Sequence, residues 1–401
     1  MLKTIAKRLV PARAVERYRV WEFRQNLSPL ARRVLAEDRR GLTRRDPGIQ
    51  PCIDAALGWL CRAQDKSASQ DGGVARDFSL LRGWNASYPE TTGYIVPTMI
   101  AAGDAYDRPA LLERARRMLD WLTAIQLDGG GFQGGTIGQT PVVPVTFNTG
   151  QILIGLAAGA ARFGDVHYHE AMHRAAAFLR DSQDDDGCWR RHPTPFAMAG
   201  DKAYETHVAW GLFEAERVAP GEGYGQAGLR QVRWALTRQA ANGWFADNCL
   251  NQPHAPLTHT IGYALRGLIE AYRLASEEEP LAAALRTADA LLACIDSDGR
   301  IAGRLDRHWQ PAVPWVCLTG TAQIAACWWL LGELCARSDY FAAAKRANAF
   351  VRRTVKLEGD ADIVGGVKGA FPVDGDYAAM EYPNWAAKFF IDAQMLEQRL
   401  G

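Results

Sequence analysis

The stretch from Leu119 to Gly155 decides the fold, and it reads LDWLTAIQLDGGGFQGGTIGQTPVVPVTFNTGQILIG. An apolar helical pattern runs to Gln126 and is followed by a glycine-rich tip, Asp128-Gly129-Gly130-Gly131-Phe132. Phe147-Asn148-Thr149-Gly150-Gln151 then opens a second apolar helix. The stretch therefore predicts a helical hairpin with an elaborate connection between its two helices.

The same pattern recurs along the chain. Glycine tips stand at Asp71-Gly72-Gly73, Asp128-Gly129-Gly130, Asp186-Gly187, Asn242-Gly243, Asp298-Gly299 and Gly365-Gly366. The first five are 56 to 58 residues apart and the last interval is about 67. Three tips share a preceding Gln and a following aromatic residue: Gln126 with Phe132, Gln183 with Trp189, and Gln239 with Trp244. This recurrence indicates a repeat architecture, in which the tips are turns built on Gly and Asp.

A helix that is apolar nearly all round follows each tip. The predicted ranges are 91–102, 149–161, 206–218, 260–274, 319–334 and 385–396. Such helices are expected to be buried, with the preceding, one-sided helix as the outer partner. Thr lies at or beside five of the six starts, where its hydroxyl can cap backbone N–H groups. Six such pairs predict an all-α fold, an (α/α)6 toroid over residues 46–401. An open solenoid is the alternative, although about 57 residues per hairpin is long for one.

Charge separates the first 45 residues from the rest. The 401-residue chain has a net charge of +1, yet residues 1–45 carry thirteen Lys or Arg against four Asp or Glu. Asp46-Pro47-Gly48 marks the boundary between this basic helical arm and the toroid. The arm could lie on an anionic membrane surface, or it could pack on the body with its arginines solvated.

The start of the chain lacks the pattern of a secretory signal, and no run approaches the roughly 18 apolar residues that span a bilayer. Eight scattered cysteines without a CxxC pair suggest reduced core thiols. We therefore expect a cytoplasmic protein, with peripheral contact at the inner membrane through residues 1–45 as a further expectation. No nucleic-acid partner and no cofactor are expected.

In a closed toroid the parallel inner helices bring their N-termini to one mouth, where helix dipoles favour anionic or oxygen-rich ligands. Glu90 and Glu205 form a candidate carboxylate pair there, as glycoside hydrolysis requires. Separations of roughly 6.5–9.5 Å would indicate inversion and about 5 Å retention. The alternative is that each carboxylate only interacts with its own helix dipole.

His207 and His259 also lie at the predicted mouth, near Tyr88, Tyr204 and Tyr263. His and Tyr as base and acid, with Asn148 neutralising a carboxylate, would suit proton abstraction beside a uronic acid carboxyl. That step starts a polysaccharide lyase or uronosyl epimerase reaction, which a solitary Glu90 beside His and Tyr would favour. The alternative is that the histidines only bond backbone carbonyls.

Other polar and aromatic side chains near the helix starts are predicted to bind the substrate, the tryptophans by stacking on sugar rings. They are Trp84, Tyr88, Asn148, Gln151, Trp244, Tyr263, Thr319, Gln323, Asn384, Trp385 and Lys388. A metal site is not expected, because the one tight histidine cluster (His167, His169 and His173) lies away from the mouth and lacks further ligands.

The Gln–Asp–Gly–aromatic tips resemble the repeats of squalene cyclases and protein prenyltransferases. That resemblance makes a terpene cyclase or isoprenoid-binding enzyme the rival interpretation. Two features depart from it: Asp184-Asp185-Asp186 does not form a DxDD acid motif, and Trp315 stands where an Asp should precede Cys317 by two positions.

A closer resemblance covers roughly residues 80–395 and is to toroid proteins of bacterial exopolysaccharide gene clusters, which are six-hairpin and glycosidase-like. The matching stretches are Trp84 to Tyr94, Phe147 to Gln151, Pro256 to Thr260, Cys317 to Gly320 and Tyr382 to Phe390. Glu205-Thr206-His207 stands where that group is expected to have Asn-Thr-Arg, which makes Glu90 the stronger catalytic candidate. The resemblance implies a polysaccharide pathway without fixing the reaction.

These observations favour an enzyme acting on an oligosaccharide or lipid-linked saccharide in exopolysaccharide biosynthesis. Glu90 would be the acid or base, assisted by His259, His207 and Glu205. Glycoside hydrolase and uronate lyase or epimerase both stay open. A saccharide-binding protein without turnover is the third hypothesis.

Overall fold

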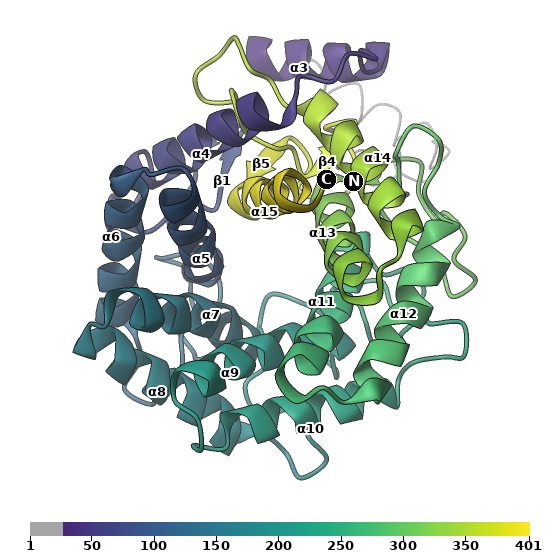
Figure 1. Ribbon diagram of the computed structural model, residues 1–401. Helices are drawn as coiled ribbons and strands as arrows, with labels where there is room; N and C mark the ends of the chain where they lie inside the picture. The colour runs from purple at the N-terminus through teal and green to yellow at the C-terminus, as the bar shows by residue number, and fades with distance from the viewer. Residues whose placement is uncertain (1–26) are drawn as a thin grey trace, which may run out of the picture.

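Two concentric rings of helices form the structure, a computed structural model that describes residues 27–401 (Figure 1). The inner ring comprises α5 (Pro89–Ala105), α7 (Thr146–Phe163), α9 (Thr206–Val218), α11 (Thr258–Ala275), α13 (Leu318–Cys335) and α15 (Asn384–Leu400). The outer ring comprises α4 (Ile49–Asp65), α6 (Pro109–Ile125), α8 (Val166–Ser182), α10 (Tyr224–Leu236), α12 (Glu278–Leu292) and α14 (Ser338–Thr354). This arrangement confirms the predicted (α/α)6 toroid.

The inner helices are largely buried because neighbours cover them on both flanks and on the outside. In α13, every residue from Leu318 to Gly332 is buried, including Trp328 and Trp329. Close approach between neighbours depends on small residues: a Cβ on Gly155 of α7 would overlap the backbone of Gly93 in α5. The helices that the sequence predicted to be apolar nearly all round are therefore the inner helices, which pack between neighbouring helices.

Each glycine tip connects the two helices of its own hairpin and packs against the outer helix of the next hairpin around the ring. Each tip glycine has a positive φ and lies against a backbone carbonyl of the following outer helix: Gly130 on Arg174, Gly187 on Arg230, Gly243 on Arg286 and Gly299 on Arg346. Gly365, at the sixth tip, lies against Ala55 of α4, the first outer helix. Trp59 Nε1 in α4 also donates to the Asp362 carbonyl at 2.9 Å. These contacts close the ring, so the open solenoid is excluded.

The glutamine that precedes several tips bonds the tip to the next outer helix. Gln126 Nε2 donates to the carbonyls of Gly130, at 2.8 Å, and Ala171, at 3.0 Å. Gln183 repeats the arrangement with Gly187 and Ala227, at 2.8 and 2.9 Å. Buried amides bonded in this way satisfy carbonyls that the turn would otherwise leave unpaired.

The threonines at the inner-helix starts do not cap their own helices, contrary to the prediction. Thr149 Oγ donates to the Val145 carbonyl at 2.8 Å and accepts the N–H of Phe132, a residue of the tip, at 2.9 Å. Thr92 makes the same pair of bonds with Tyr88 and Val74. The hydroxyl therefore links the tip to the helix, and in α7 the helix already begins at Thr146, so Thr149 lies inside its first turn.

Short strands lie in the connections. β1 (Asp77–Ser79) pairs antiparallel with β2 (Gly83–Trp84) on one side and β5 (Glu381–Pro383) on the other. β3 (Val316–Cys317) pairs antiparallel with β4 (Ala370–Phe371), and η1 (Ala203–Glu205) is a single 3-10 turn before α9. The first sheet matters for the site, because it brings the residues around Asp77 beside Glu381 from the other end of the chain.

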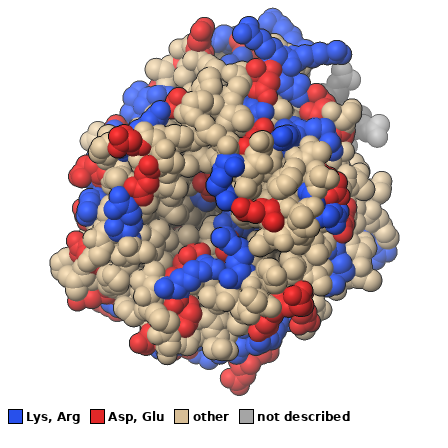
Figure 2. Space-filling model, in the orientation of Figure 1, with Lys and Arg blue, Asp and Glu red and all other residues tan. Residues whose placement is uncertain are grey.

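The described part of the basic arm packs on the toroid. Its helix α3 (Pro29–Arg40) buries Ala31, Val34 and Leu35, and Lys and Arg gather over it at the top of Figure 2. Asp38 of α3 pairs with Lys368 and accepts the Val373 N–H at 2.8 Å. The predicted membrane contact falls largely on residues 1–26, outside the described part of the chain. None of the helices in residues 27–401 is long and apolar enough to cross a membrane.

We expect Lys368→Met to lower the free energy of unfolding by about 3 kcal/mol, because it leaves the buried Asp38 carboxylate without its partner. The side chains of this pair are only 3% and 5% exposed. Lys356→Met is the matched control: Lys356 also joins the C-terminal segment to α3, through Glu37 at 2.9 Å, but this pair is 44% and 34% exposed. The control should change stability by less than about 1 kcal/mol in urea unfolding. If the two variants lost equal stability, the buried Lys368–Asp38 pair would not contribute more to folding than the exposed Lys356–Glu37 pair.

No disulfide joins any of the eight cysteines, all of which lie in residues 27–401. Five are buried: Cys52, Cys188, Cys249, Cys317 and Cys327. Burial raises the pKa of Cys52, Cys188, Cys317 and Cys327 to about 12. These four thiols are therefore protonated packing groups at neutral pH.

Candidate functional site

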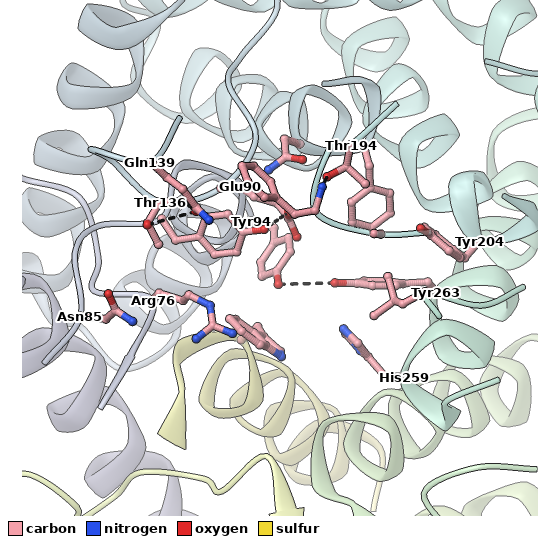
Figure 3. A pocket seen from close by; sticks show the side chains of 18 of the residues that line it. Arg76, Asn85, Glu90, Tyr94, Thr136, Gln139, Thr194, Tyr204, His259 and Tyr263 are labelled. Atoms are coloured by element: carbon pink, nitrogen blue, oxygen red, sulfur yellow. Dashed lines mark hydrogen bonds between the residues drawn. The ribbon is translucent and has the colours of Figure 1, made fainter. Parts of the chain in front are cut away.

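A cavity of about 570 Å³ opens where the inner helices begin, as predicted for the mouth (Figure 3). Its wall comes from the starts of α5, α7, α11 and α15, from η1 before α9, and from the loops between the rings. Of the residues predicted from sequence to lie at the site, the cavity is lined by Glu90, His259, Tyr88, Asn148, Tyr204, Tyr263 and Trp385. The toroid thus brings together residues from five of its six hairpins.

Glu90 is the second residue of α5 and is only 8% exposed. The Tyr88 hydroxyl donates to its Oε2 at 2.6 Å. Burial raises the pKa of the Glu90 carboxyl to about 7, although the Tyr88 hydrogen bond and the charge of Arg76 each lower it somewhat. A carboxyl with this pKa is substantially protonated at neutral pH and can donate a proton to a bound substrate.

His259 occupies the corresponding second position of α11. Its Nδ1 lies 2.6 Å from Gln323 Oε1, and burial lowers the pKa of the imidazole to about 4. With the amide oxygen as acceptor, Nδ1 carries the proton of a neutral ring and Nε2 carries a lone pair. Nε2 has no hydrogen-bond partner within residues 27–401. His259 is therefore placed to act as a base.

Aromatic side chains make up much of the remaining wall. Tyr94 and Tyr263 approach each other at 3.5 Å between hydroxyl oxygens (Figure 3), and Trp385 Nε1 donates to the Tyr377 hydroxyl at 2.8 Å. Burial raises the pKa of Tyr88, Tyr94 and Tyr263 well above the usual value, so these phenols are protonated donors. Polar side chains of Asn85, Thr136, Gln139 and Thr194 also line the cavity.

The structure does not bring Glu205 to this cavity. Glu205 lies in η1, and its Oε2 is buried without a hydrogen-bond partner in residues 27–401. Burial raises the pKa of the Glu205 carboxyl to about 8, which the charge of Lys202 partly opposes. The carboxylate pair that would identify a two-carboxylate glycosidase is therefore not assembled around the cavity.

His207 lies behind the cavity wall. Its Nδ1 is 2.6 Å from Gln151 Oε1, and the side chain is fully buried. The Tyr263 ring contacts both histidines, with its centroid 4.4 Å from that of His207 and 4.3 Å from that of His259. Burial lowers the pKa of His207 well below the usual value. His207 and Gln151 therefore form the same kind of hydrogen-bonded pair as His259 and Gln323, but they do not line the cavity.

Several of the other predicted binding residues make contacts within the protein instead. Trp84 packs on Trp59 and Phe78, with ring centroids 5.3 and 5.2 Å away. Asn384 Nδ2 donates to the Ala75 carbonyl at 2.9 Å, and Lys388 Nζ pairs with Asp392 at 2.7 Å. The residues predicted from sequence that do not line the cavity are Glu205, His207, Trp84, Gln151, Trp244, Thr319, Gln323, Asn384 and Lys388.

Within residues 27–401, no three His, Cys, Asp or Glu side chains gather in the manner of a metal site. His173 of the cluster considered above has its Nδ1 3.0 Å from the Tyr224 hydroxyl. The expectation that the protein needs neither metal nor cofactor stays a prediction.

Several solved carbohydrate enzymes share this architecture. An unsaturated glucuronyl hydrolase specific for heparin aligns with a TM-score of 0.70 at 14% identity, over 88% of this chain and 97% of that one. The unsaturated glucuronyl hydrolase of Bacillus sp. GL1 aligns at 0.69 and 15% identity, over 88% and 98%. The cellobiose 2-epimerase of Bacillus thermoamylovorans B4167 aligns at 0.69 and 10% identity, over 87% and 98%.

The chain has the toroid fold of these enzymes. No protein-family model matches it, and no curated protein matches it significantly. At 10–15% identity the likeness shows the fold alone. The assignment of chemistry therefore depends on the residues of the cavity.

Sequence reasoning missed several lining residues, of which Arg76 is the most important. One signal could have narrowed the search. Four residues after the tip glycine, three hairpins carry glycine, at Gly134, Gly303 and Gly369, and the other three carry a charged residue, at Arg76, Arg191 and Asp247. Tyr377, Thr194 and Gln139 lie in irregular loops, where no periodic signal exists.

Proposed function

We propose that the chain is an enzyme that acts on an oligosaccharide by acid–base catalysis, with Glu90 as acid and His259 as base. The observation that carries the proposal is a protonatable carboxyl and a neutral imidazole in one cavity. The pKa of Glu90 is about 7 and that of His259 about 4, so between these values the acid is protonated and the base is free. Opposite pKa shifts of this kind separate the roles of acid and base in enzyme sites.

Among sugar reactions, a solitary carboxyl favours uronate elimination or epimerisation over two-carboxylate hydrolysis. In elimination, His259 Nε2 would take the proton from the carbon beside the uronate carboxyl, and Glu90 would protonate the departing glycosidic oxygen as the C–O bond breaks. In epimerisation, a proton would return to the opposite face of the same carbon. Fold neighbours that act on glucuronyl saccharides and on cellobiose support a saccharide as substrate.

Isotope labelling distinguishes these reactions. Oligosaccharides of glucuronic, galacturonic and mannuronic acid are incubated with the protein in D₂O and, separately, in H₂¹⁸O. Epimerisation is expected to place deuterium on the ring carbon without ¹⁸O, and elimination to give an unsaturated sugar without ¹⁸O. One ¹⁸O atom per cleaved bond would instead show hydrolysis and overturn the preferred chemistry. Saccharide binding without any turnover would support a binding protein.

The pH dependence tests the assignment of acid and base. Below about pH 4 His259 gains a proton and loses its basic lone pair, and above about pH 7 Glu90 loses the proton it must donate. We therefore expect kcat/KM to be highest between about pH 4 and 7 and to fall on both sides. An activity that instead rises through pH 7 would make Glu90 the base.

A second candidate function has one observation in its favour. The cavity is lined by aromatic rings, including Tyr94, Phe147 and Trp385, around one isolated acid, as a terpene cyclase or isoprenoid-binding enzyme would require. Arg76 is the only Lys or Arg among the described lining residues, so the cavity offers little charge to hold a diphosphate. Calorimetric titration with geranyl and farnesyl diphosphate tests this candidate, and tight binding would favour it over the saccharide enzyme.

The cellular setting rests on the family resemblance seen in the sequence. We propose that the substrate belongs to exopolysaccharide biosynthesis, either as a free or as a lipid-linked saccharide, in the cytoplasm. The basic residues of the arm would hold the enzyme near the inner membrane. Co-sedimentation of the full chain with anionic vesicles, compared with a chain that begins at residue 27, tests the membrane contact.

A further inference from the structure

Arg76 is held in a fixed position at the cavity wall. It directly precedes β1, and its Nη1 donates to Asp77 and, at 3.1 Å, to Glu381 Oε2. Its guanidinium carbon lies 5.3 Å from the centroid of Trp385, which also lines the cavity. In Figure 3 Arg76 lies beside Asn85, and Glu90 and His259 border the same space.

The groups around Arg76 are themselves held by neighbours. Glu381 Oε1 accepts from Arg82 Nη2 at 2.9 Å, and Asp77, which is fully buried, accepts from Asn85 at 3.3 Å. A guanidinium held at one nitrogen by two carboxylates needs little reorganisation when a ligand binds.

The rest of the guanidinium is free. Nε and Nη2 have no hydrogen-bond partner within residues 27–401, and 31% of the side chain is exposed. These two N–H groups form the planar edge that can bond both oxygens of a carboxylate at once.

The charge of the cavity limits what this edge can bind. Arg76 is the only Lys or Arg among the described lining residues, and the histidine that lines the cavity is neutral at physiological pH. Arg76 already pairs with Asp77 and Glu381 through Nη1, so what it offers a ligand is one planar Nε–Nη2 edge, and this edge matches a single carboxylate. A phosphate or diphosphate would bring two or more negative charges close to Glu381 and Glu90 without further cations.

We propose that Arg76 binds the carboxylate of an acidic sugar and so makes the enzyme specific for a uronic-acid residue of its oligosaccharide. This inference rests on the proposed function and names its substrate class. Pairing the carboxylate with Arg76 also makes the neighbouring C–H more acidic, which is the bond that His259 would attack. Arg76 thus takes the role that the sequence suggested for Asn148.

The test compares each uronic-acid oligosaccharide with its carboxyl-reduced, neutral counterpart. Arg76→Gln is expected to weaken binding of the acidic oligosaccharide, measured calorimetrically as Kd, about 100-fold, and binding of the neutral one less than about threefold, because a charged bidentate contact is lost only from the acid. Arg76→Lys keeps the charge without the planar edge. Its affinity for the acidic oligosaccharide is therefore expected to lie between those of the wild type and Arg76→Gln. Equal losses on both substrates, or no loss on either, would overturn the proposal.

Arg82→Gln is the matched control. Arg82 bonds the same Glu381 carboxylate, but its side chain is 71% exposed and it does not line the cavity. Arg82→Gln should leave the affinity for both oligosaccharides within about threefold of that of the wild type, because no contact with the sugar is lost. If Arg82→Gln reproduced the selective loss, the cause would be the Glu381 position and the direct contact would be refuted.

Binding measurements separate this inference from the proposed function. Calorimetry on Glu90→Gln protein, with and without Arg76→Gln, reports recognition where turnover is absent. If the protein prefers the acidic sugar only when Arg76 is present, and the wild type turns nothing over, the role of Arg76 in binding is supported and the catalytic proposal is refuted. Binding of hexose phosphates or sulfated hexoses as tightly as the uronate would refute the carboxylate assignment, as would binding of no acidic sugar at all.

Discussion

Replacing Glu90 with Gln is expected to lower kcat for a uronic-acid oligosaccharide by about 1,000-fold, the scale at which a positioned general acid contributes. The amide is nearly the same size and can still accept the Tyr88 hydrogen bond, so the cavity keeps its shape. It cannot donate a transferable proton. KM should therefore change little while the chemical step slows. Initial rates at saturating substrate, near pH 6, measure the effect.

Glu205→Gln provides a matched control for this experiment. The two carboxyls are equally buried, at 8% and 7% exposure, and the pKa of each is raised, but only Glu90 lines the cavity. Glu205→Gln should retain activity within about threefold, since nothing that touches the substrate changes. Full activity in Glu90→Gln would refute the acid assignment. Equal losses in both variants, with lowered thermal stability, would indicate a structural effect instead.

Gly365→Ala is expected to lower the free energy of unfolding by about 2–5 kcal/mol. Two effects add at this residue. Its φ is +80°, a region that disfavours an L side chain by about 1–2 kcal/mol. An added Cβ would also overlap the Ala55 carbonyl oxygen of α4, and overpacking of this kind typically costs about 1–3 kcal/mol. Urea unfolding followed by circular dichroism measures the change.

Gly359→Ala separates backbone strain from ring closure. Gly359 lies in the same connection and has φ +117°, but no atom lies within 4 Å of an added Cβ. It should lower stability by only about 1–2 kcal/mol, the contribution of the positive φ. If the two variants lost equal stability, the contact between the sixth tip and the first outer helix would not contribute to the closed ring.

The helices were predictable because their signals are local. The predicted range 206–218 coincides with α9, and the range 319–334 differs from α13 by one residue at each end. The tips were predictable for the same reason, since the glycines adopt a positive φ wherever the repeat places them. The closed ring followed from counting hairpins that each need two neighbours.

The site was only partly predictable, and the histidines show why. His207 and His259 both stand at the second position of an inner helix. Only His259 lines the cavity, because the Tyr263 ring contacts both histidines and encloses His207 on its other side. Glu205 shows the same point, because its neighbour Tyr204 in η1 lines the cavity and Glu205 does not.

The sequence by itself determined the toroid, its six hairpins and the mouth at which polar residues gather, because apolar periodicity and glycine turns act within one hairpin. Only the tertiary structure decided which polar groups face the cavity. That choice depends on how each inner helix is rotated against its neighbours and on how loops such as the one carrying Arg76 cross the mouth. The raised pKa of Glu90 and the lowered pKa of His259 likewise come from burial, which no short stretch of sequence specifies.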